Sequence, residues 1–489
     1  MKSCYMPPDA HTLMWSTRAI GYTTPAAVAD LIDNSIYAKA SQIFIDYIGG
    51  EYVAILDNGE GMDSEELKEA MKYGSGNPGQ YRSSQDLGRF GLGLKTASLS
   101  QCRKLTVISK NSKGVSGFCW DLDYVIKKED WQLLELEEND IKSMPQYDCL
   151  EVLNQGTLVV WQNLDKLCAG IEDVACGMIR KMGEVEEHLA VTFHRFLQGE
   201  AGLKKIELYI NGLHIKGKDP FWTDRSDEMP SEKIAVAYEE NQIKKEDYAI
   251  VTPYILPFPD TLTQQELDEL GGKEGLIKSQ GFYIYRNKRL IVAADWFKLA
   301  RKTDLTKLCR VKVDIPNSMD EAWTLDVKKS MAVPPEAVLK NLKRIVIPIL
   351  NTGKRKYRFR AKKESSQGNM KVWMPGETRN GMIYAINREY PIIKDITNEL
   401  GNSRKLEILL RLIEQNIPLN RIHSDFYDDK KFASEDVNKA YENVKENLRM
   451  LLRELSPEKR IDEFNELMKM APFSEYEITY SDLGDIDNG

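Results

Sequence analysis

The sequence has no long apolar run and no clustered cysteines, and these absences exclude several classes of protein. No segment approaches the roughly 20 apolar residues that span a bilayer, and the N-terminus lacks the apolar core of a signal peptide. The seven cysteines are scattered and never occur in CxxC spacing, which argues against a disulfide or zinc framework. We therefore expect a cytoplasmic protein with no membrane segment and with reduced thiols.

The charge balance and the length narrow the remaining possibilities. The formal net charge is −8, which argues against a nucleic-acid-binding surface that extends over the whole chain. A chain of 489 residues is too long for one ordinary hydrophobic core and predicts about three domains. A hydrophobic content of 42% with 29% charged residues is typical of a soluble globular protein.

The sequence also lacks a P-loop, yet four short segments together predict an ATP site of another kind. They are Asp30–Asn34, Asp57–Gly61, Gly88–Lys95 and Gly156–Thr157. The third is not a Walker A motif, because that motif needs consecutive Gly-Lys-Ser/Thr. Each segment alone has a plain structural interpretation, so the prediction depends on their occurrence together.

The first segment predicts a helix over residues 25–38 with Thr24 as N-cap and Pro25 at the first helical position. Asp30 and Asn34, four residues apart, share one side of this helix and point into the same space. An asparagine oxygen suits Mg²⁺, and a carboxylate suits the orientation or deprotonation of a water that attacks a phosphate. The alternative is an amphipathic surface helix whose polar residues are solvated.

The second segment follows a strand-like apolar run and contains Asp57, Gly59, Gly61 and Met62. Two glycines after a strand let the backbone turn sharply and approach a planar ligand. Asp57 would then accept a hydrogen bond from an adenine amino group. A plain turn is the alternative, whereas the spacing of the acidic residues excludes a calcium loop.

The third segment places Gly88, Gly91 and Gly93 before helix-like sequence that contains Lys95. Backbone amides at a helix N-terminus attract phosphate, and Lys95 adds positive charge. The preceding loop, residues 72–84, is predicted to be a lid that becomes ordered over nucleotide. A flexible linker is the alternative interpretation of this loop.

Taken together, these segments resemble those of GHKL ATPases, the group of gyrase B subunits, ninety-kilodalton heat-shock chaperones, MutL proteins and MORC proteins. The resemblance covers roughly residues 10–345, and the sequences of the motifs are nearest to those of MORC-like and MutL-like members. It implies a Bergerat-type α/β sandwich that binds ATP in residues 1–180 and a ribosomal-S5-like αβ transducer domain in residues 181–352. A basic linker and a mostly helical region, residues 353–489, would follow.

The resemblance also implies roles for individual residues, with ATP and Mg²⁺ as cofactors. Asp30 stands where the family usually has Glu, so its shorter side chain implies slow hydrolysis. Lys329, with Lys328 as the competing choice, would reach the γ-phosphate from the transducer domain, and Asn34 would bind Mg²⁺. The residues expected to bind ATP are Asn34, Asp57, Gly59, Gly61, Met62, Gly88, Gly91, Gly93, Lys95 and Thr157.

A basic segment after the predicted transducer domain suggests a polynucleotide partner. Its cations are interleaved with aromatic rings, a combination that suits phosphates and stacked bases. A solvated helix end or linker is the alternative. The cations are Lys354, Arg355, Lys356, Arg358, Arg360, Lys362 and Lys363.

Two hypotheses for the function follow from the resemblance. In relatives, lid closure promotes dimerisation, which implies an ATP-dependent homodimer that acts as a clamp or switch. The first hypothesis is action on DNA or with a partner nuclease or helicase, in DNA repair or in defence against foreign DNA. The second is a chaperone-like ATPase that remodels polypeptide clients through the C-terminal helices.

The hydrophobic periodicity predicts the order of helices and strands. Strands are expected at residues 42–48, 53–57, 104–109 and 157–161, with helices at 25–38 and 63–72. A helix from residue 184 would lead into a second αβ unit that has strands at 205–210, 282–285 and 311–315 and a helix from 335. The C-terminal helices are expected at 406–417 and 433–455, and His188 and His194 are expected to have packing or surface roles.

Overall fold

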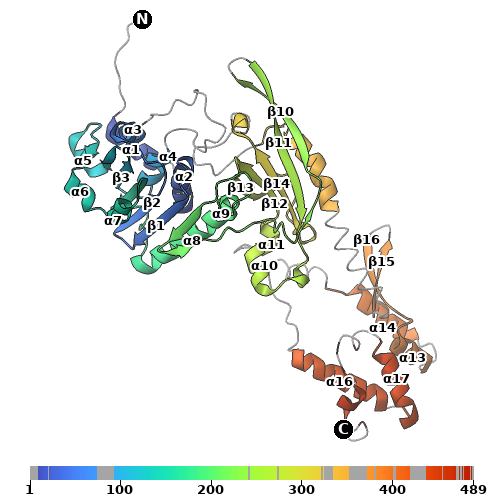
Figure 1. Ribbon diagram of the computed structural model, residues 1–489. Coiled ribbons are helices and arrows are strands. Elements are labelled where there is room, and N and C mark those ends of the chain that lie inside the picture. Colours follow the sequence, from blue (N-terminus) through green and yellow to red (C-terminus); the bar gives the residue numbers. More distant parts are fainter. Residues whose placement is uncertain are drawn as a thin grey trace. The chain divides into compact units, whose positions relative to one another are not determined.

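A computed structural model of the chain contains two compact units, Met1–Lys354 and Arg355–Gly489 (Figure 1). We describe each unit by itself. The residues that the structure describes are 9–19, 21–73, 93–240, 243–271, 275–320, 323, 334–336, 338–351, 372–378, 381–399, 404–418, 437–453, 455–469, 473, 476, 478–484 and 486.

The first unit begins with a sheet whose described strands follow the order β5-β4-β3-β6-β2-β1-β7-β8. Strand β1 pairs in parallel with β7, and the other neighbours are antiparallel. The predictions of the four strands before residue 162 are confirmed. The bounds are β1 Gln42–Ile48, β2 Tyr52–Asp57, β3 Lys104–Asn111, β4 Gly114–Asp121, β5 Leu134–Glu135, β6 Gly156–Gln162, β7 Glu207–Ile210 and β8 Leu213–His214.

Helices cover both faces of this sheet, so strands β2, β3 and β6 are apolar on both sides. One core joins Ile55 and Val107 of the sheet to Ile32 and Leu189 of the helices on that face. Helices α6 Glu138–Lys142 and α7 Tyr147–Val152 pack on the other face. This arrangement confirms the predicted α/β sandwich. The first face carries α1 Ala10–Arg18, α2 Thr24–Tyr37, α3 Ser64–Met71, α4 Gly93–Leu99, α5 Leu122–Lys128, α8 Val174–Thr192 and α9 His194–Gln198.

The N-terminal cap of α2 differs from the prediction by one residue. The side chain of Thr23 accepts the hydrogen bond from the amide of Ala26, 3.4 Å away, and Pro25 lies inside the first turn. Thr24 is therefore the first helical residue and not the cap. Pro25 still fits, because the first-turn amides of a helix have no partner within the helix.

The segment between the two sheets corrects two expectations. The helix predicted from residue 184 is interrupted at Phe193, where α8 ends and α9 begins. The strand predicted at 205–210 does not belong to the second unit of sheet and helix. It forms β7, which pairs with β1 so that Gln42 lies opposite Glu207. Apolar alternation identifies a strand but does not identify its partner.

A second sheet follows in the order β10-β11-β14-β12-β13, with β9 paired to β11. One face packs against a helical stretch, residues 338–351, through Val338 and Leu342. The opposite face carries the aromatic residues Phe221 and Tyr285. The predicted strands at 282–285 and 311–315 are confirmed, whereas the long β10–β11 hairpin was not predicted. The strand bounds are β9 Asp227–Glu228, β10 Glu232–Glu240, β11 Ile243–Ile255, β12 Gly281–Arg286, β13 Arg289–Asp295 and β14 Cys309–Ile315.

The hairpin of β12 and β13 closes with a two-residue turn. Arg286 lies opposite Arg289, so Asn287 and Lys288 form the turn. Both have positive φ, +47° and +70°, as a type I′ turn requires. Asparagine tolerates this conformation, whereas a lysine adopts it at a cost of about 1 kcal/mol.

The second unit contains a hairpin and helices with a core of their own. Its core includes Leu448, Leu452, Phe464 and Leu483. The helices predicted at 406–417 and 433–455 are confirmed over the residues that the structure describes there. The bounds are β15 Trp373–Thr378, β16 Gly381–Ile386, α13 Pro391–Glu399, α14 Arg404–Gln415, α16 Val437–Arg453 and α17 Arg460–Leu467. Across the described residues of both units, we find no helix with the length and apolar composition needed to cross a bilayer.

Candidate functional site

Asp57 is a buried acceptor at the C-terminal end of β2. One carboxylate oxygen accepts a hydrogen bond from the hydroxyl of Ser35, at 2.9 Å, and the other accepts one from the amide of Gly59, at 2.8 Å. Burial raises the pKa of Asp57, and the hydrogen bonds from Gly59, Ser35 and Thr157 oppose that rise. The carboxylate is therefore held in one orientation where the strand ends.

Thr157 lies directly opposite Asp57 in the antiparallel pairing of β6 with β2. Its hydroxyl is 2.9 Å from the hydroxyl of Ser109, which in turn accepts a hydrogen bond from the amide of Met62 at 2.9 Å. Ser109, on β3, thus connects the second predicted segment with the fourth. Sequence patterns did not identify Ser109, because a serine in an apolar strand carries no motif of its own.

Three glycines of these segments allow the protein backbone to approach itself closely. A Cβ on Gly61, whose φ is +67°, would lie 2.0 Å from the carbonyl oxygen of Lys110. A Cβ on Gly156 would lie 2.2 Å from the carbonyl oxygen of Asp57, and one on Gly59 would lie 2.8 Å from that of Ala38. Glycine is needed here for the protein's own packing. The predicted approach of Gly59 and Gly61 to a planar ligand stays a prediction.

Asp30 lies one and a half turns before Ser35 on the same helix, α2. The hydroxyl of Tyr22 donates a hydrogen bond to one of its carboxylate oxygens at 2.9 Å. A Cβ on Gly93 would be 3.6 Å from that same oxygen. The first residue of α4 therefore lies beside Asp30, and the first and third predicted segments meet.

Asn34 and Asp30 differ in exposure, and the expectation that both point into the same space stays a prediction. Asp30 is buried, whereas Asn34 is exposed. Within the ranges that the structure describes, no group of three or more His, Cys, Asp or Glu side chains is arranged to hold a metal ion. Mg²⁺ needs no such group, because it is commonly held by one or two protein oxygens together with substrate phosphates and water. The exposed amide oxygen of Asn34 fits that requirement.

Lys95 is buried, and its ammonium donates a hydrogen bond to the carbonyl of Ala70 at 2.8 Å. Ala70 belongs to the last turn of α3, where the carbonyl groups carry partial negative charge. Burial lowers the pKa of Lys95 to about 8. The charge of this lysine therefore changes close to neutral pH.

Several predicted site residues lie outside the described residues, and their roles stay predictions. They include Gly88 and Gly91 of the third segment and residues 74–84 of the expected lid. Both candidates for the γ-phosphate contact, Lys328 and Lys329, belong to this group. So do the seven cations of the basic segment, Lys354, Arg355, Lys356, Arg358, Arg360, Lys362 and Lys363.

The second sheet contributes a charge to the region of Asp30. Arg289, the first residue of β13, has its Nε 3.1 Å from the carboxylate of Asp33 and its Nη2 3.9 Å from an oxygen of Asp30. All three side chains are buried, with exposed fractions of 4%, 1% and 2% for Arg289, Asp33 and Asp30. Sequence patterns did not predict this contact, because the arginine and the helix lie about 256 residues apart.

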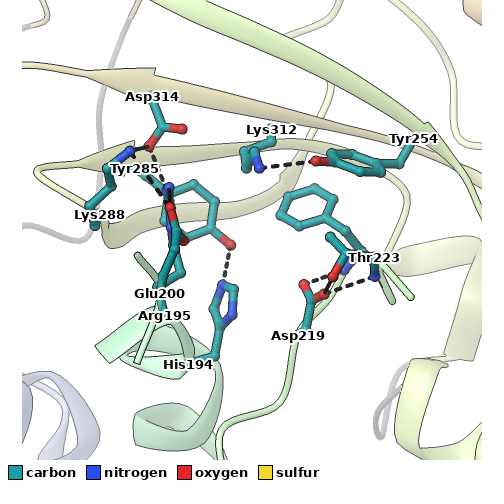
Figure 2. Close-up of polar contacts among 11 residues, drawn as sticks. His194, Arg195, Glu200, Asp219, Thr223, Tyr254, Tyr285, Lys288, Lys312 and Asp314 are labelled. Carbon is teal, nitrogen blue, oxygen red and sulfur yellow. Dashed lines mark hydrogen bonds and ion pairs between the residues drawn. The ribbon is translucent and has the colours of Figure 1, made fainter. Parts of the chain in front are cut away.

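A second group of polar contacts joins α9 to the same hairpin (Figure 2). His194 lies 2.9 Å from the hydroxyl of Tyr285, and burial lowers the pKa of His194 to about 4. Arg195 forms ion pairs with Glu200 and with Asp314 of β14. The ammonium of Lys288 in the hairpin turn approaches the same two carboxylates, at 3.9 and 3.8 Å. The predicted packing role fits His194, which is a buried hydrogen-bond partner.

Comparisons with known proteins agree with the predicted resemblance. Residues 22–157 match the family described as Histidine kinase-, DNA gyrase B-, and HSP90-like ATPase. The chain is 31% identical over 88 residues to ATPase morc-1 of Caenorhabditis elegans, a match that covers 17% of this chain and 10% of that protein. It is 33% identical over 96 residues to ATPase MORC2B of Mus musculus, covering 18% and 9%. The chain thus spans about a tenth of the length of these relatives.

A solved structure is among the matches in the structural comparison. It is the Aquifex aeolicus MutL ATPase domain complexed with ADP, with a TM-score of 0.30 and 13% identity. The match covers 60% of this chain and 93% of that one.

The α/β sandwich and the segments that meet on α2 agree with the prediction of a nucleotide-binding domain without a P-loop. Residues 22–157 are similar to the ATPase domain of the GHKL superfamily. Two MORC proteins are similar to this chain in sequence.

Proposed function

We propose that the protein is a Mg²⁺-dependent ATP hydrolase that works as an ATP-gated clamp or switch. One observation carries this proposal: separate segments of the chain converge on α2, with Asp57 beside Ser35 and with Gly93 beside Asp30. Asp30 and Ser35 are five residues apart, or about 7 Å along the helix axis. An elongated ligand along α2 would therefore meet an acceptor at one end and a carboxylate at the other.

The adenine end would be formed by the Asp57 group. The Asp57 carboxylate would accept a hydrogen bond from the adenine amino group, in addition to the bonds from Ser35 and Gly59 that hold it in place. Thr157, opposite Asp57, would support it through the adjacent backbone. Gly61 and Met62 would lie beside the base.

The phosphate end would be formed by the start of α4 and by the exposed side of α2. Gly88, Gly91, Gly93 and Lys95 would hold phosphates through amides and positive charge. Asn34 would bind Mg²⁺, which neutralises phosphate charge when it is bound. Lys329, or Lys328, would reach the γ-phosphate from the second sheet's part of the chain. Because ADP lacks the γ-phosphate, this contact would make the position of the second sheet depend on whether ATP is bound.

Asp30 would take the proton from the water that attacks the γ-phosphate. The side chain is one methylene shorter than the glutamate usual in the superfamily, so its carboxylate lies farther from that water. Hydrolysis is therefore expected to be slow. The hydrogen bond from Tyr22 and the neighbouring Gly93 support this role, because they hold Asp30 next to the start of α4.

The proposed substrate of the clamp is DNA, handled together with a partner nuclease or helicase in DNA repair or in defence against foreign DNA. Support comes from the similarity to MORC proteins and from the basic segment, residues 354–363. Closure of the lid over ATP would promote a homodimer, and hydrolysis would reopen it. This cycle would allow the protein to enclose a strand and release it.

ATP hydrolysis rates of the full chain with and without DNA test this proposal. We expect DNA to stimulate hydrolysis and the stimulation to disappear when the seven cations of residues 354–363 are neutralised. Light scattering with a non-hydrolysable ATP analogue should show a doubling of mass. Absence of ATP binding by calorimetry would refute the whole proposal, whereas ATP hydrolysis that DNA leaves unchanged would refute only the DNA clamp.

A polypeptide-remodelling ATPase is the second candidate function, and one feature of α14 favours it. Ile408, Leu409 and Leu412 of this helix are about half exposed. Exposed apolar side chains grouped on a helix suit a hydrophobic protein segment. Stimulation of hydrolysis by an unfolded client protein, and not by DNA, would support this candidate.

A further inference from the structure

We propose that Arg289 is a positioning residue for hydrolysis, which makes the rate depend on where the β12–β13 hairpin lies relative to α2. This inference rests on the proposed function, because it assigns regulation to the same Asp30 site. Arg289 would hold Asp33 and set the charge around Asp30 without contacting ATP. The hairpin would thereby control the proposed general base.

The distances separate a structural contact from an electrostatic one. The Nε of Arg289 is 3.1 Å from Asp33, within hydrogen-bonding range, and its Nη2 is 3.9 Å from Asp30, beyond that range. At 3.9 Å in a buried site, a positive charge still strongly favours the ionised form of a carboxylate. Arg289 is therefore attached to Asp33 and acts on Asp30 at a distance.

Asp30 and Asp33 need this cation because they lie on the same side of one helix. Residues three apart on a helix are neighbours, and both of these acids are buried. Two buried carboxylates without a shared cation repel each other. Withdrawal of Arg289 would therefore let Asp30 leave its position beside Gly93, and the proposed base would no longer be aligned.

The hairpin belongs to the second sheet, because β12 pairs with β14, so Arg289 follows that sheet. The hairpin also contacts residues in and after α9. Tyr285 contacts His194 of α9, and Lys288 approaches Glu200 and Asp314 (Figure 2). The turn between Arg286 and Arg289 has two residues, which leaves little slack. A shift of the second sheet relative to α2 would therefore move the guanidinium away from the two acids.

Arg286 provides a matched control on the same hairpin. It is also buried, with 3% of its side chain exposed, and it forms a two-point ion pair with Asp320 at 2.6 and 2.7 Å. Asp320 belongs to the second sheet's part of the chain and not to α2. Arg286 and Arg289 are three residues apart, and the variants Arg286→Met and Arg289→Met each break one buried ion pair. Only the ion pair of Arg289 reaches Asp33 on α2.

The test compares these variants in the full chain. We expect Arg289→Met to lower kcat about tenfold or more, which corresponds to about 1.4 kcal/mol of activation free energy, and to leave the dissociation constant of ATP within about threefold. Arg286→Met should leave kcat within about twofold. Equal losses of kcat in the two variants, or an unchanged kcat in Arg289→Met, would overturn the inference.

Two further measurements extend the test beyond the rate of Arg289→Met alone. Asp33→Asn keeps the shape of the side chain, and we expect the double variant with Arg289→Met to be no slower than Arg289→Met alone. Hydrogen exchange in α2 should increase in Arg289→Met and not in Arg286→Met, independently of turnover. Equal exchange in both variants would show that the hairpin does not hold α2. Lack of ATP hydrolysis by the unmodified chain would instead refute the proposed function.

Discussion

The two ends of the candidate site differ in where their polar contacts originate. Asp57 receives hydrogen bonds from Ser35 and Gly59 and lies opposite Thr157, all within the first sheet and its helices. Asp30 and Asp33, on the same helix, face Arg289 from the second sheet. The end proposed to recognise the base is thus complete within one part of the fold. The end proposed to perform chemistry is completed from elsewhere in the chain.

This difference suggests that binding and turnover respond to different events. Movement of the second sheet would leave the Asp57 group intact and would change the charge around Asp30. Nucleotide would then bind equally well in two arrangements and be hydrolysed in one. Four substitutions test the two ends separately, beginning with the largest expected effect.

The largest effect is expected at the catalytic end. Asp30→Asn should lower kcat by at least about 100-fold, because it removes a general base, and it should retain ATP binding. Single-turnover hydrolysis and calorimetry measure the two quantities separately. Unchanged hydrolysis in this variant would remove Asp30 from the mechanism, and loss of binding would mean that the two ends are not independent.

The next effect is expected at the recognition end. Asp57→Ala should weaken ATP binding about 30-fold, or about 2 kcal/mol, the typical contribution of a hydrogen bond to a charged group. Competition between ATP and GTP provides the control, because only the adenine amino group donates to Asp57. We expect the preference for ATP to fall by the same factor. An unaltered preference would exclude Asp57 from base recognition.

A third substitution tests whether backbone contacts hold the recognition end together. Gly61→Ala would bring a Cβ to 2.0 Å from the Lys110 carbonyl, whereas Gly212, with a similar φ of +77°, has no atom within 4 Å of such a Cβ. Both variants incur backbone strain, but Gly61→Ala should be less stable than Gly212→Ala by about 1–2 kcal/mol. Urea denaturation of both variants measures the difference. Equal stability would mean that the contact relaxes without cost.

The smallest effect is expected in the pH dependence of ATP binding. The pKa of Lys95 is lowered to about 8, so the lysine loses its charge as the pH rises through 8, while bound phosphate favours the charged form. Affinity should therefore fall about fivefold between pH 8 and pH 9. Lys95→Arg should not show this fall, because a guanidinium keeps its charge to pH 12. Parallel profiles for lysine and arginine would exclude Lys95 from phosphate binding.

Local patterns in the sequence predicted much of the first sheet and of the recognition end. The strands near Asp57 and Thr157 have apolar runs that end at turn residues, so their positions follow from periodicity alone. The family resemblance then assigned Asp57 and Thr157, which are 100 residues apart, to one ATP site, and the strand register pairs them. Neither the resemblance nor the periodicity indicated Ser109, which joins them through side-chain hydroxyls.

The contacts between distant parts of the chain were not predictable in this way. The role of Arg289 was not predicted, because an arginine in a strand does not specify which acid it contacts. The strand at 205–210 was correctly expected to be extended but was assigned to the wrong sheet. The burial of Asp30 beside an exposed Asn34 also depends on what packs against each turn of α2. Helical periodicity alone does not contain that information.

The two-residue turn of the β12–β13 hairpin has a consequence for attempts to engineer a more heat-resistant form. Glycine in place of Lys288 would be the usual choice at a position with a φ of +70°. That substitution would relax the backbone and at the same time delete the ammonium near Glu200 and Asp314. A more stable hairpin would thus be obtained at the loss of its contacts with Glu200 and Asp314. A higher melting temperature would then be accompanied by weaker coupling between the hairpin and the segment that follows α9.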